Sequence, residues 1–224
     1  MGLITLKELH KGLGGKGKEV QVLKGIDLTV DKGQTISVMG ASGVGKSTLL
    51  NIMGALDRPT SVDVLYRDSP LSGLDDRRLA SMRNRFVGFV FQSHHLLPEF
   101  SALENVMLPA LIGGVNRIEA QKRAEALLEE VGLGSRLGHK PGELSGGEQQ
   151  RAAIVRALVQ TPEAILADEP TGNLDTKTAE EVFEVLLTLN RSRGTAIVMV
   201  THNERLSSRL ERRLQMVDGK IFED

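Results

Sequence analysis

The chain has 224 residues, of which 40% are hydrophobic and 25% are charged, and its formal net charge is −1. Such a length and composition are ordinary for one soluble globular domain, or for a domain with a subdomain. A net charge this close to zero gives the protein no general attraction to nucleic acid or to an anionic membrane.

Signals for secretion or membrane insertion are missing from the sequence. It contains no cysteine, so no disulfide can form, and this suits a reducing compartment. The first six residues show no basic region followed by an apolar run, so they do not predict a signal peptide. No apolar stretch approaches the ~20 residues needed to cross a bilayer. We therefore expect any action at a membrane to go through a partner, without direct insertion.

The first part of the chain predicts strands, turns and one helix. Residues 26–30 alternate between apolar and polar side chains, and residues 35–39 form a short β-branched run, so both are predicted strands joined by a turn at 31–34. A helix is predicted from Ser47 to Leu56, directly after a glycine-rich loop.

The middle of the chain is predominantly helical. After a strand predicted at residues 86–91, the pattern is helical from about residue 101 to residue 159. One apolar stripe at helical spacing comprises Ala120, Ala124, Leu127, Leu128 and Val131. The charged residues on the other faces are interpreted as a solvated surface. We expect this region to be a subdomain inserted between the early and the late strands.

The last part of the chain alternates strands with a helix. Residues 164–167 have the length and composition of a buried parallel strand, 176–190 predict a helix, and 195–200 predict another strand. Residues 215–221 read as a hairpin with an Asp-Gly turn. Strands that alternate with helices predict an α/β fold with a mainly parallel core sheet.

The clearest motif is a glycine-rich loop of the form G-x-x-x-x-G-K-[ST], which lies between a predicted strand and a predicted helix. It comprises Gly40, Ala41, Ser42, Gly43, Val44, Gly45, Lys46 and Ser47, and Thr48 follows it in the helix. Glycine-rich backbone and a helix start direct N–H groups at phosphate oxygens. Lys46 supplies a cation for the β- and γ-phosphates, and Ser47 supplies a hydroxyl for Mg²⁺. Taken alone, the same pattern also suits a glycine-rich turn that binds nothing.

Two adjacent carboxylates follow the apolar run at 164–167. Asp168 and Glu169 therefore lie at the C-terminal end of a predicted strand, where open α/β sheets bind their ligands. Asp168 is placed to hold Mg²⁺, directly or through its water, and Glu169 is placed to polarise an attacking water. Without the glycine loop, a pair of solvated acids at a strand end would explain the pattern equally well.

A pair of adjacent glycines precedes the amphipathic helix predicted at 152–159. The segment is Leu144-Ser145-Gly146-Gly147-Glu148. Its N–H groups and the Ser145 hydroxyl form a second anion site. The chain then either binds two nucleotides or clamps one nucleotide between two molecules; a glycine N-cap without a ligand is the alternative for the local pattern alone.

Together these motifs resemble the ABC ATPase family, over essentially the whole chain and in the family's order. The matching segments are 40–47 (Walker A), Gln92 (Q-loop), 144–148 (signature), 165–169 (Walker B with the catalytic glutamate), 173–175 (D-loop) and His202 (H-loop). The resemblance implies a P-loop NTPase fold with an antiparallel β subdomain and an inserted helical subdomain. The single domain, 1–224, would have a RecA-like core at about 1–92 and 160–224 and a helical subdomain at about 93–159.

The same resemblance implies a head-to-tail homodimer in the ATP state. Each ATP would lie between the glycine loop of one subunit and the Ser145 turn of the other, which also contains Gly146, Gly147 and Glu148. Ser145 and Gly147 would touch the γ-phosphate, and Asp175 would face the opposite subunit.

Two further roles follow from the resemblance. Gln92 would sense Mg²⁺ and the attacking water, and His202 would contact the γ-phosphate and help to position Glu169. From the residue pattern alone, a single histidine after a strand is more often structural or exposed than functional.

A finer resemblance extends over residues 83–106 and 168–175. They are similar to the LolD-type ATPase subunits, which work with LolC/LolE-like integral membrane subunits to release lipoproteins from the bacterial inner membrane. This implies a peripheral protein on the cytoplasmic face, with the membrane partner docking near Gln92–Pro98. His94 and His95 lie in that segment, and exposed loop residues are the plain alternative. No further ligands are grouped near them, which argues against metal binding.

Rival interpretations are a MacB-type efflux ATPase, an FtsE-like regulator of a cell-wall partner that transports nothing, and a soluble ABC protein of DNA repair or translation. MacB-type ATPases are normally joined to a membrane domain, and we expect none here because the sequence ends at Asp224. The DNA-repair and translation proteins resemble tandem or coiled-coil-inserted chains, and this chain has neither feature.

Several residues depart from the family pattern. Leu13 occupies the position of an adenine-stacking aromatic residue, which predicts weaker discrimination for adenine. Ser93 replaces a phenylalanine at the expected docking surface, and Val44 replaces a serine that contributes only backbone. Val62 and Asp68 stand where turn glycines are usual; aspartate tolerates a left-handed turn better than valine does, so Val62 is the expected site of strain.

Overall fold

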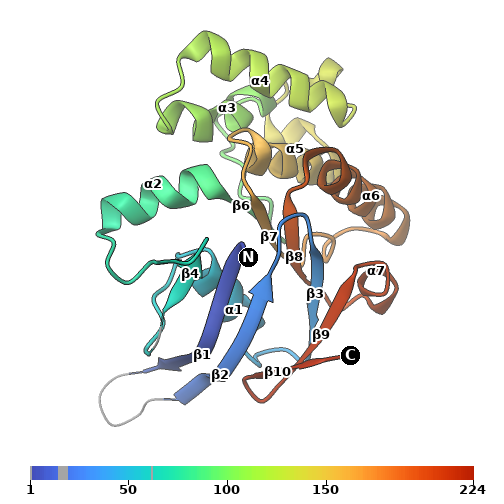
Figure 1. The fold of residues 1–224 in the computed structure, drawn as a ribbon. Helices are drawn as coiled ribbons and strands as arrows, with labels where there is room; N and C mark the ends of the chain where they lie inside the picture. The colour runs from blue at the N-terminus through green and yellow to red at the C-terminus, as the bar shows by residue number, and fades with distance from the viewer. Residues whose placement is uncertain (1, 15–19, 62) are drawn as a thin grey trace.

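The computed structural model describes residues 2–14, 20–61 and 63–224. Two sheets organise these residues: a six-stranded sheet of order β10-β9-β3-β8-β7-β6 and a four-stranded sheet of order β2-β1-β4-β5. The four-stranded sheet lies on one side of the six-stranded sheet, and α3, α4 and α5 gather at the end of the molecule away from the four-stranded sheet, at the top of the view (Figure 1).

The six-stranded sheet is mainly parallel, as predicted. Its strands are β3 (Thr35–Met39), β6 (Val87–Phe91), β7 (Ala164–Asp168), β8 (Ala196–Val200), β9 (Arg212–Val217) and β10 (Lys220–Glu223). Only the β9–β10 pair is antiparallel. Every residue of β8 is buried, and β3 and β7 are buried except at their last residues. Burial on both faces explains why these strands appear in the sequence as short continuous apolar runs.

The four-stranded sheet is antiparallel, and the sequence pattern predicted only part of it. It consists of β1 (Ile4–Leu13), β2 (Val20–Val30), β4 (Val64–Tyr66) and β5 (Ser69–Pro70). The strand predicted at 26–30 is the second half of β2. β1 was not predicted, because its pairing with β2 shifts register near Glu8, whose φ of 47° interrupts the regular alternation of side chains.

The helices are α1 (Lys46–Met53), α2 (Asp76–Phe86), α3 (Ala102–Ile112), α4 (Arg117–Glu130), α5 (Gly146–Leu158), α6 (Thr176–Arg193) and α7 (Glu204–Ser207). Short 3₁₀ turns occur at Gly134–Arg136 and Pro141–Glu143. α1 ends at Met53 rather than at Leu56, since Gly54 caps it and Ala55 turns into the left-handed region. α5 begins at Gly146, ahead of the predicted helix at 152–159.

The sequence pattern does not predict helix α2, and it places Phe86, the last residue of this helix, in the following strand. Only Leu79 and Met82 of this helix are buried, so no apolar stripe announces it. Its start is fixed by Asp75, whose side chain accepts a hydrogen bond from Arg78 N at 2.8 Å. Phe86 ends α2, and strand β6 begins one residue later, at Val87.

The hydrophobic core lies on both faces of the six-stranded sheet. One cluster joins the inner faces of α3 to α6 to the sheet, and the predicted stripe of α4, including Val131, is buried in it. The other cluster joins the antiparallel sheet and α1 to the opposite face. Among the described residues, no helix combines the length and the apolar character that a bilayer crossing requires.

The predicted turns are partly tested. Asp218 and Gly219 take positive φ values and close the β9–β10 hairpin, as the Asp-Gly pair predicts. Asp68 has a φ of 62°, which confirms a left-handed turn there. Val62 lies outside the described residues.

Tyr66 provides a test of the fold at high pH. It is buried, and its hydroxyl donates to Met53 O at 2.6 Å. Burial raises the pKa of this phenol in the folded state. The stabilisation that comes from keeping the phenol neutral is therefore fully present below the pKa of the unfolded chain, about 10, and is lost as the pH rises from there toward the pKa of the folded state. Because Tyr66 is the only tyrosine and tryptophan is absent, tyrosinate absorbance reports on this residue alone. We expect tyrosinate to appear only together with loss of the helical circular dichroism, whereas in denaturant it titrates near pH 10. Ionisation near pH 10 with the fold intact would contradict the burial.

Candidate active site

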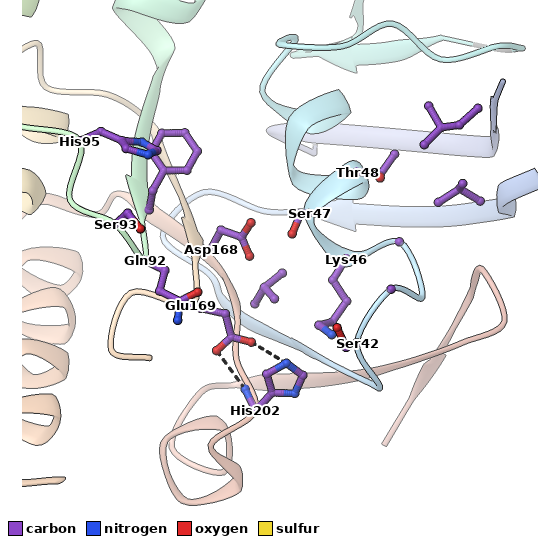
Figure 2. A pocket seen from close by; sticks show the side chains of 16 residues that line it. Ser42, Lys46, Ser47, Thr48, Gln92, Ser93, His95, Asp168, Glu169 and His202 are labelled. Carbon is purple, nitrogen blue, oxygen red and sulfur yellow. Dashed lines mark hydrogen bonds and ion pairs between the residues drawn. The ribbon is translucent and has the colours of Figure 1, made fainter. Parts of the chain in front are cut away.

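A pocket of about 510 Å³ opens at the C-terminal ends of the parallel strands (Figure 2). The residues that line it are Leu13, Val22, Ser42, Gly43, Gly45, Lys46, Ser47, Thr48, Phe91, Gln92, Ser93, His95, Asp168, Glu169, Val200 and His202. One cavity therefore brings together predicted site residues from four motifs: the glycine loop, the Q-loop, the acidic pair and the H-loop. The exceptions are Gly40, Ala41 and Val44, which belong to the loop but do not line the cavity.

The glycine loop takes a conformation that needs glycine. Gly40, Gly43 and Gly45 have φ values of 146°, 79° and 110°. A Cβ atom on Gly40 would lie 2.3 Å from Met216 O, so a side chain there would collide with the backbone of β9. Lys46 is buried, and its Nζ donates to Gly40 O and Ala41 O at 2.8 Å each. The ammonium group is therefore held inside the loop.

Helix α1 begins without a side-chain cap. Its N-cap residue is Gly45, and its first turn contains no acidic residue. Every other α-helix in the described part of the chain begins with a side chain that accepts a bond from its first turn. The first N–H groups of α1 therefore point toward the pocket unpaired by a capping side chain, together with the positive end of the helix dipole. A phosphate is the natural partner for such donors.

Glu169 and His202 face each other across neighbouring strand ends (Figure 2). Glu169 Oε1 lies 3.0 Å from His202 Nε2, and Glu169 Oε2 accepts from the His202 backbone N–H at 3.3 Å. Burial raises the pKa of the Glu169 carboxyl, while His202 and Lys46 partly oppose the rise. A more basic carboxylate is better suited to draw a proton from water. Glu169 also has a φ of 47°, a strained conformation of the kind found at functional sites.

Three oxygen donors of the pocket suit a magnesium ion. They are the Ser47 hydroxyl, the Asp168 carboxylate and the Gln92 amide oxygen. No cluster of three or more His, Cys, Asp or Glu side chains with metal-binding geometry occurs among the described residues. Mg²⁺ commonly takes one or two carboxylates and completes its shell with phosphate and water, so this donor set fits that ion.

The Ser145 turn lies outside the pocket of its own chain. Ser145 caps α5: its hydroxyl accepts from Glu148 N at 3.3 Å, and Glu148 Oε2 accepts from Ser145 N at 2.8 Å. These bonds, with help from Arg136, lower the pKa of Glu148. Gly147 packs against α6, where a Cβ would lie 2.4 Å from the Thr178 methyl group. A single chain therefore does not bring Ser145, Gly146, Gly147 and Glu148 to the glycine loop.

Asp175 also lies away from the pocket. It caps α6, since its carboxylate accepts from Lys177 N and Thr178 N at 3.1 Å each. Its bonds to Thr178 lower the pKa of the carboxyl, which is exposed and ionised. Asp175 is therefore presented on the surface next to the Ser145 turn, because Gly147 packs on Thr178 of the same helix.

The segment after Gln92 is held by contacts that no sequence motif predicts. Arg156 of α5 donates through Nη1 to His95 O at 2.5 Å and through Nη2 to His94 O at 2.7 Å. The His94 ring is hydrogen-bonded to the buried Gln150 side chain, so His94 is more than an exposed loop residue. His95 has a φ of 49° and packs its ring on Phe91 at 5.0 Å. No motif links these residues, so the sequence carried no signal for the contacts.

Aliphatic side chains occupy the end of the pocket formed by the antiparallel sheet. Leu13 ends β1 and is 46% exposed, and Val22 of β2 lies beside it in the lining. The aromatic rings of Phe91 and His95 belong to the β6 side of the pocket, and Figure 2 shows His95 far from Thr48. Among the described residues, the platform next to α1 is therefore aliphatic.

Comparisons with known proteins agree with this geometry. A family model described as ABC transporter matches residues 23–172. A lipoprotein-releasing system ATP-binding protein LolD from Geobacter metallireducens is 59% identical over 222 residues, 99% of each chain. The protein of the same name from Myxococcus xanthus is 48% identical over 223 residues, 100% of each chain. The dimeric, post-hydrolysis ATP-binding cassette MJ0796 bound to ADP and Pi aligns with a TM-score of 0.90 at 40% identity, covering 99% of this chain and 97% of that one.

The aliphatic platform predicts that the pocket discriminates weakly between the adenine and guanine bases of nucleotides. The wild-type protein should bind ATP and GTP with similar affinity, and Leu13→Tyr should tighten ATP binding about two- to tenfold, since one stacked ring is worth roughly 0.5–1.5 kcal/mol. Titration calorimetry with both nucleotides measures the effect, with Leu13→Val as the aliphatic control. A strong preference of the wild type for ATP would count against this interpretation.

Proposed function

The chain belongs to the ABC transporter family, and we propose that it is the ATP-hydrolysing subunit of a membrane complex that releases lipoproteins from the bacterial inner membrane. The observation that carries this proposal is the full-length similarity, at 59% identity, to a lipoprotein-releasing system ATP-binding protein. The pocket supports it with a lysine, a carboxylate base and oxygen donors for a metal in one cavity. Efflux ATPases and cell-wall regulators are not favoured by these relatives.

In this proposal, catalysis comes from positioning and from electrostatics. Glu169 would accept the proton of the attacking water. His202 Nε2 lies 3.0 Å from Glu169 Oε1, so it would hold this carboxylate in place and contact the γ-phosphate. Lys46 and the first N–H groups of α1 stabilise the charge on the phosphate oxygens. Mg²⁺, bound through Ser47, Asp168 and Gln92, would neutralise phosphate charge.

We further propose that the active form is a head-to-tail homodimer. The Ser145 turn is a capped helix start that lies outside its own pocket, so a second copy can bring it to the γ-phosphate held by the first. The dimeric cassettes that align with this chain support this arrangement. The two copies would together enclose each ATP, with the core of each copy facing the helical subdomain of the other.

The membrane partner is proposed to dock near Gln92–Pro98. This segment is exposed at Leu97, Pro98 and Ser93, and Arg156 anchors its backbone to α5. A LolC/LolE-like subunit bound here would place the protein on the cytoplasmic face of the inner membrane. Ser93 contributes little apolar area, so Leu97, at 42% exposure, becomes the main apolar contact of the segment.

Replacement of the base tests the hydrolytic mechanism. Glu169→Gln should lower ATP turnover about a hundredfold or more, since it removes the proton acceptor, while ATP binding and ATP-dependent dimerisation persist. Turnover is measured by phosphate release and dimerisation by light scattering. Glu163→Gln is the matched control. Glu163 lies just before the first residue of β7, at the end of the strand away from Glu169, and it pairs with Arg67. Near-normal hydrolysis by Glu169→Gln would refute the assignment.

Copurification tests the membrane partner. We expect the tagged chain to retain membrane subunits from detergent-solubilised membranes, and Leu97→Asp to lose them, since a charge would be buried at the contact. Ile118→Asp is the control, because Ile118 is an exposed apolar residue of α4 outside the docking segment. Equal recovery with both variants would place the docking surface elsewhere, and capture of efflux or cell-wall proteins would replace the proposed function.

A further inference from the structure

Gln92 and Asn173 form a reciprocal pair across 81 residues of sequence. Gln92 Nε2 donates to Asn173 Oδ1 at 2.9 Å, and Asn173 Nδ2 donates to the Gln92 backbone oxygen at 3.3 Å. Gln92 lines the pocket with Asp168 and Glu169, whereas Asn173 lies in the turn that follows Glu169 and is not part of the lining. Nothing in the chemistry proposed above uses Asn173.

The pair determines which atom of the Gln92 amide faces the pocket. The Gln92 backbone oxygen can only accept, so the Asn173 atom that contacts it must be Nδ2. Asn173 then presents Oδ1 to the Gln92 side chain, and the atom that meets Oδ1 must be the donor, Nε2. Because the two polar atoms of a planar amide point in different directions, Gln92 Oε1 is left on the side away from Asn173. One orientation of the amide is thereby selected without any ligand.

Gly172 gives the Gln92 side chain its place over the turn. A Cβ atom on Gly172 would lie 2.8 Å from Gln92 Nε2 and 3.2 Å from its Cδ, so the amide rests on bare backbone. The turn itself is anchored at both ends: Gly172 N donates to Glu169 O at 3.0 Å, and Asp175 caps α6. The position of Gln92 is therefore tied to the segment that begins with the catalytic carboxylate.

We propose that Asn173 is a positioning residue: with the Gln92 side chain resting on the bare backbone of Gly172, it orients the Gln92 amide so that the oxygen, and not the nitrogen, faces the metal of the bound nucleotide. The proposal rests on the metal role of Gln92 in the proposed function. Loss of Asn173 frees the amide to turn, and the nitrogen, which cannot bind a cation, then competes with the oxygen for the same direction.

The amide orientation is measured directly by NMR on the full chain with ¹⁵N-labelled glutamine. The Gln92 side-chain signal, identified as the one missing from Gln92→Ala, should show one hydrogen-bonded proton in the wild type. Asn173→Ala should remove that shift. Asn116→Ala, the control, should leave it unchanged, because Asn116 is also an exposed asparagine but caps α4 and does not line the pocket. An unchanged Gln92 signal in Asn173→Ala would overturn the proposal.

Metal affinity tests the consequence. Mn²⁺ binding to the chain with a non-hydrolysable ATP analogue, followed by electron paramagnetic resonance, should weaken roughly two- to tenfold in Asn173→Ala, the range for one neutral hydrogen bond. Gly172→Ala should act likewise by displacing Gln92 with Asn173 intact. Nucleotide affinity in the presence of a chelator should stay unchanged in both variants.

A double-mutant cycle separates this inference from the proposed function. If Asn173 acts through Gln92, Asn173→Ala has no further effect on Mn²⁺ affinity in a Gln92→Ala background. Additive losses would show that Asn173 acts by another route and would overturn the proposal. A normal Mn²⁺ affinity in Gln92→Ala alone would remove the metal role of Gln92 and the proposal with it. Failure of the wild type to bind the nucleotide would overturn the proposed function itself.

Discussion

Unpaired N–H groups at the start of α1 are the feature on which the site depends. An anion can be held there because no side chain of the described residues caps the helix, and because Gly40, Gly43 and Gly45 let the preceding loop turn with positive φ. The loop is positioned from both ends, by the buried strand β3 before it and by the buried face of α1 after it. The hydrophobic core thus determines where the phosphate donors point.

Sheet register then sets the position of Glu169, the proposed base. Asp168 pairs with Val200 on the neighbouring strand, so the residues that follow each strand end, Glu169 and His202, come together. The Glu169 N–H is bonded to Val200 O at 3.0 Å, which holds its backbone in the strained left-handed region at a cost on the order of 1–3 kcal/mol. The position of the Glu169 carboxylate is therefore set by the register of the parallel sheet.

The sequence predicted the features that one segment determines by itself. Short apolar runs indicated the parallel strands, because burial on both faces leaves no polar alternation, and each phosphate-binding turn has its own glycine pattern. It failed for β1, where the irregularity at Glu8 disturbs the period, and for α2, where only Leu79 and Met82 are buried. Both elements depend on tertiary packing that the local pattern does not record.

Contacts between distant segments could not be predicted from the sequence, for a different reason. Gln92 with Asn173, and Arg156 with the backbone of His94 and His95, join ordinary polar groups whose meeting depends on sheet register and helix placement. The Ser145 turn is the contrasting case: its glycines predicted an anion site, and the structure leaves that site outside the pocket of its own chain. The proposed homodimer accounts for this position, because the turn would then meet the phosphate held by the second copy. The motif pattern therefore carries information about assembly, whereas the amide contacts could be found only in the folded chain.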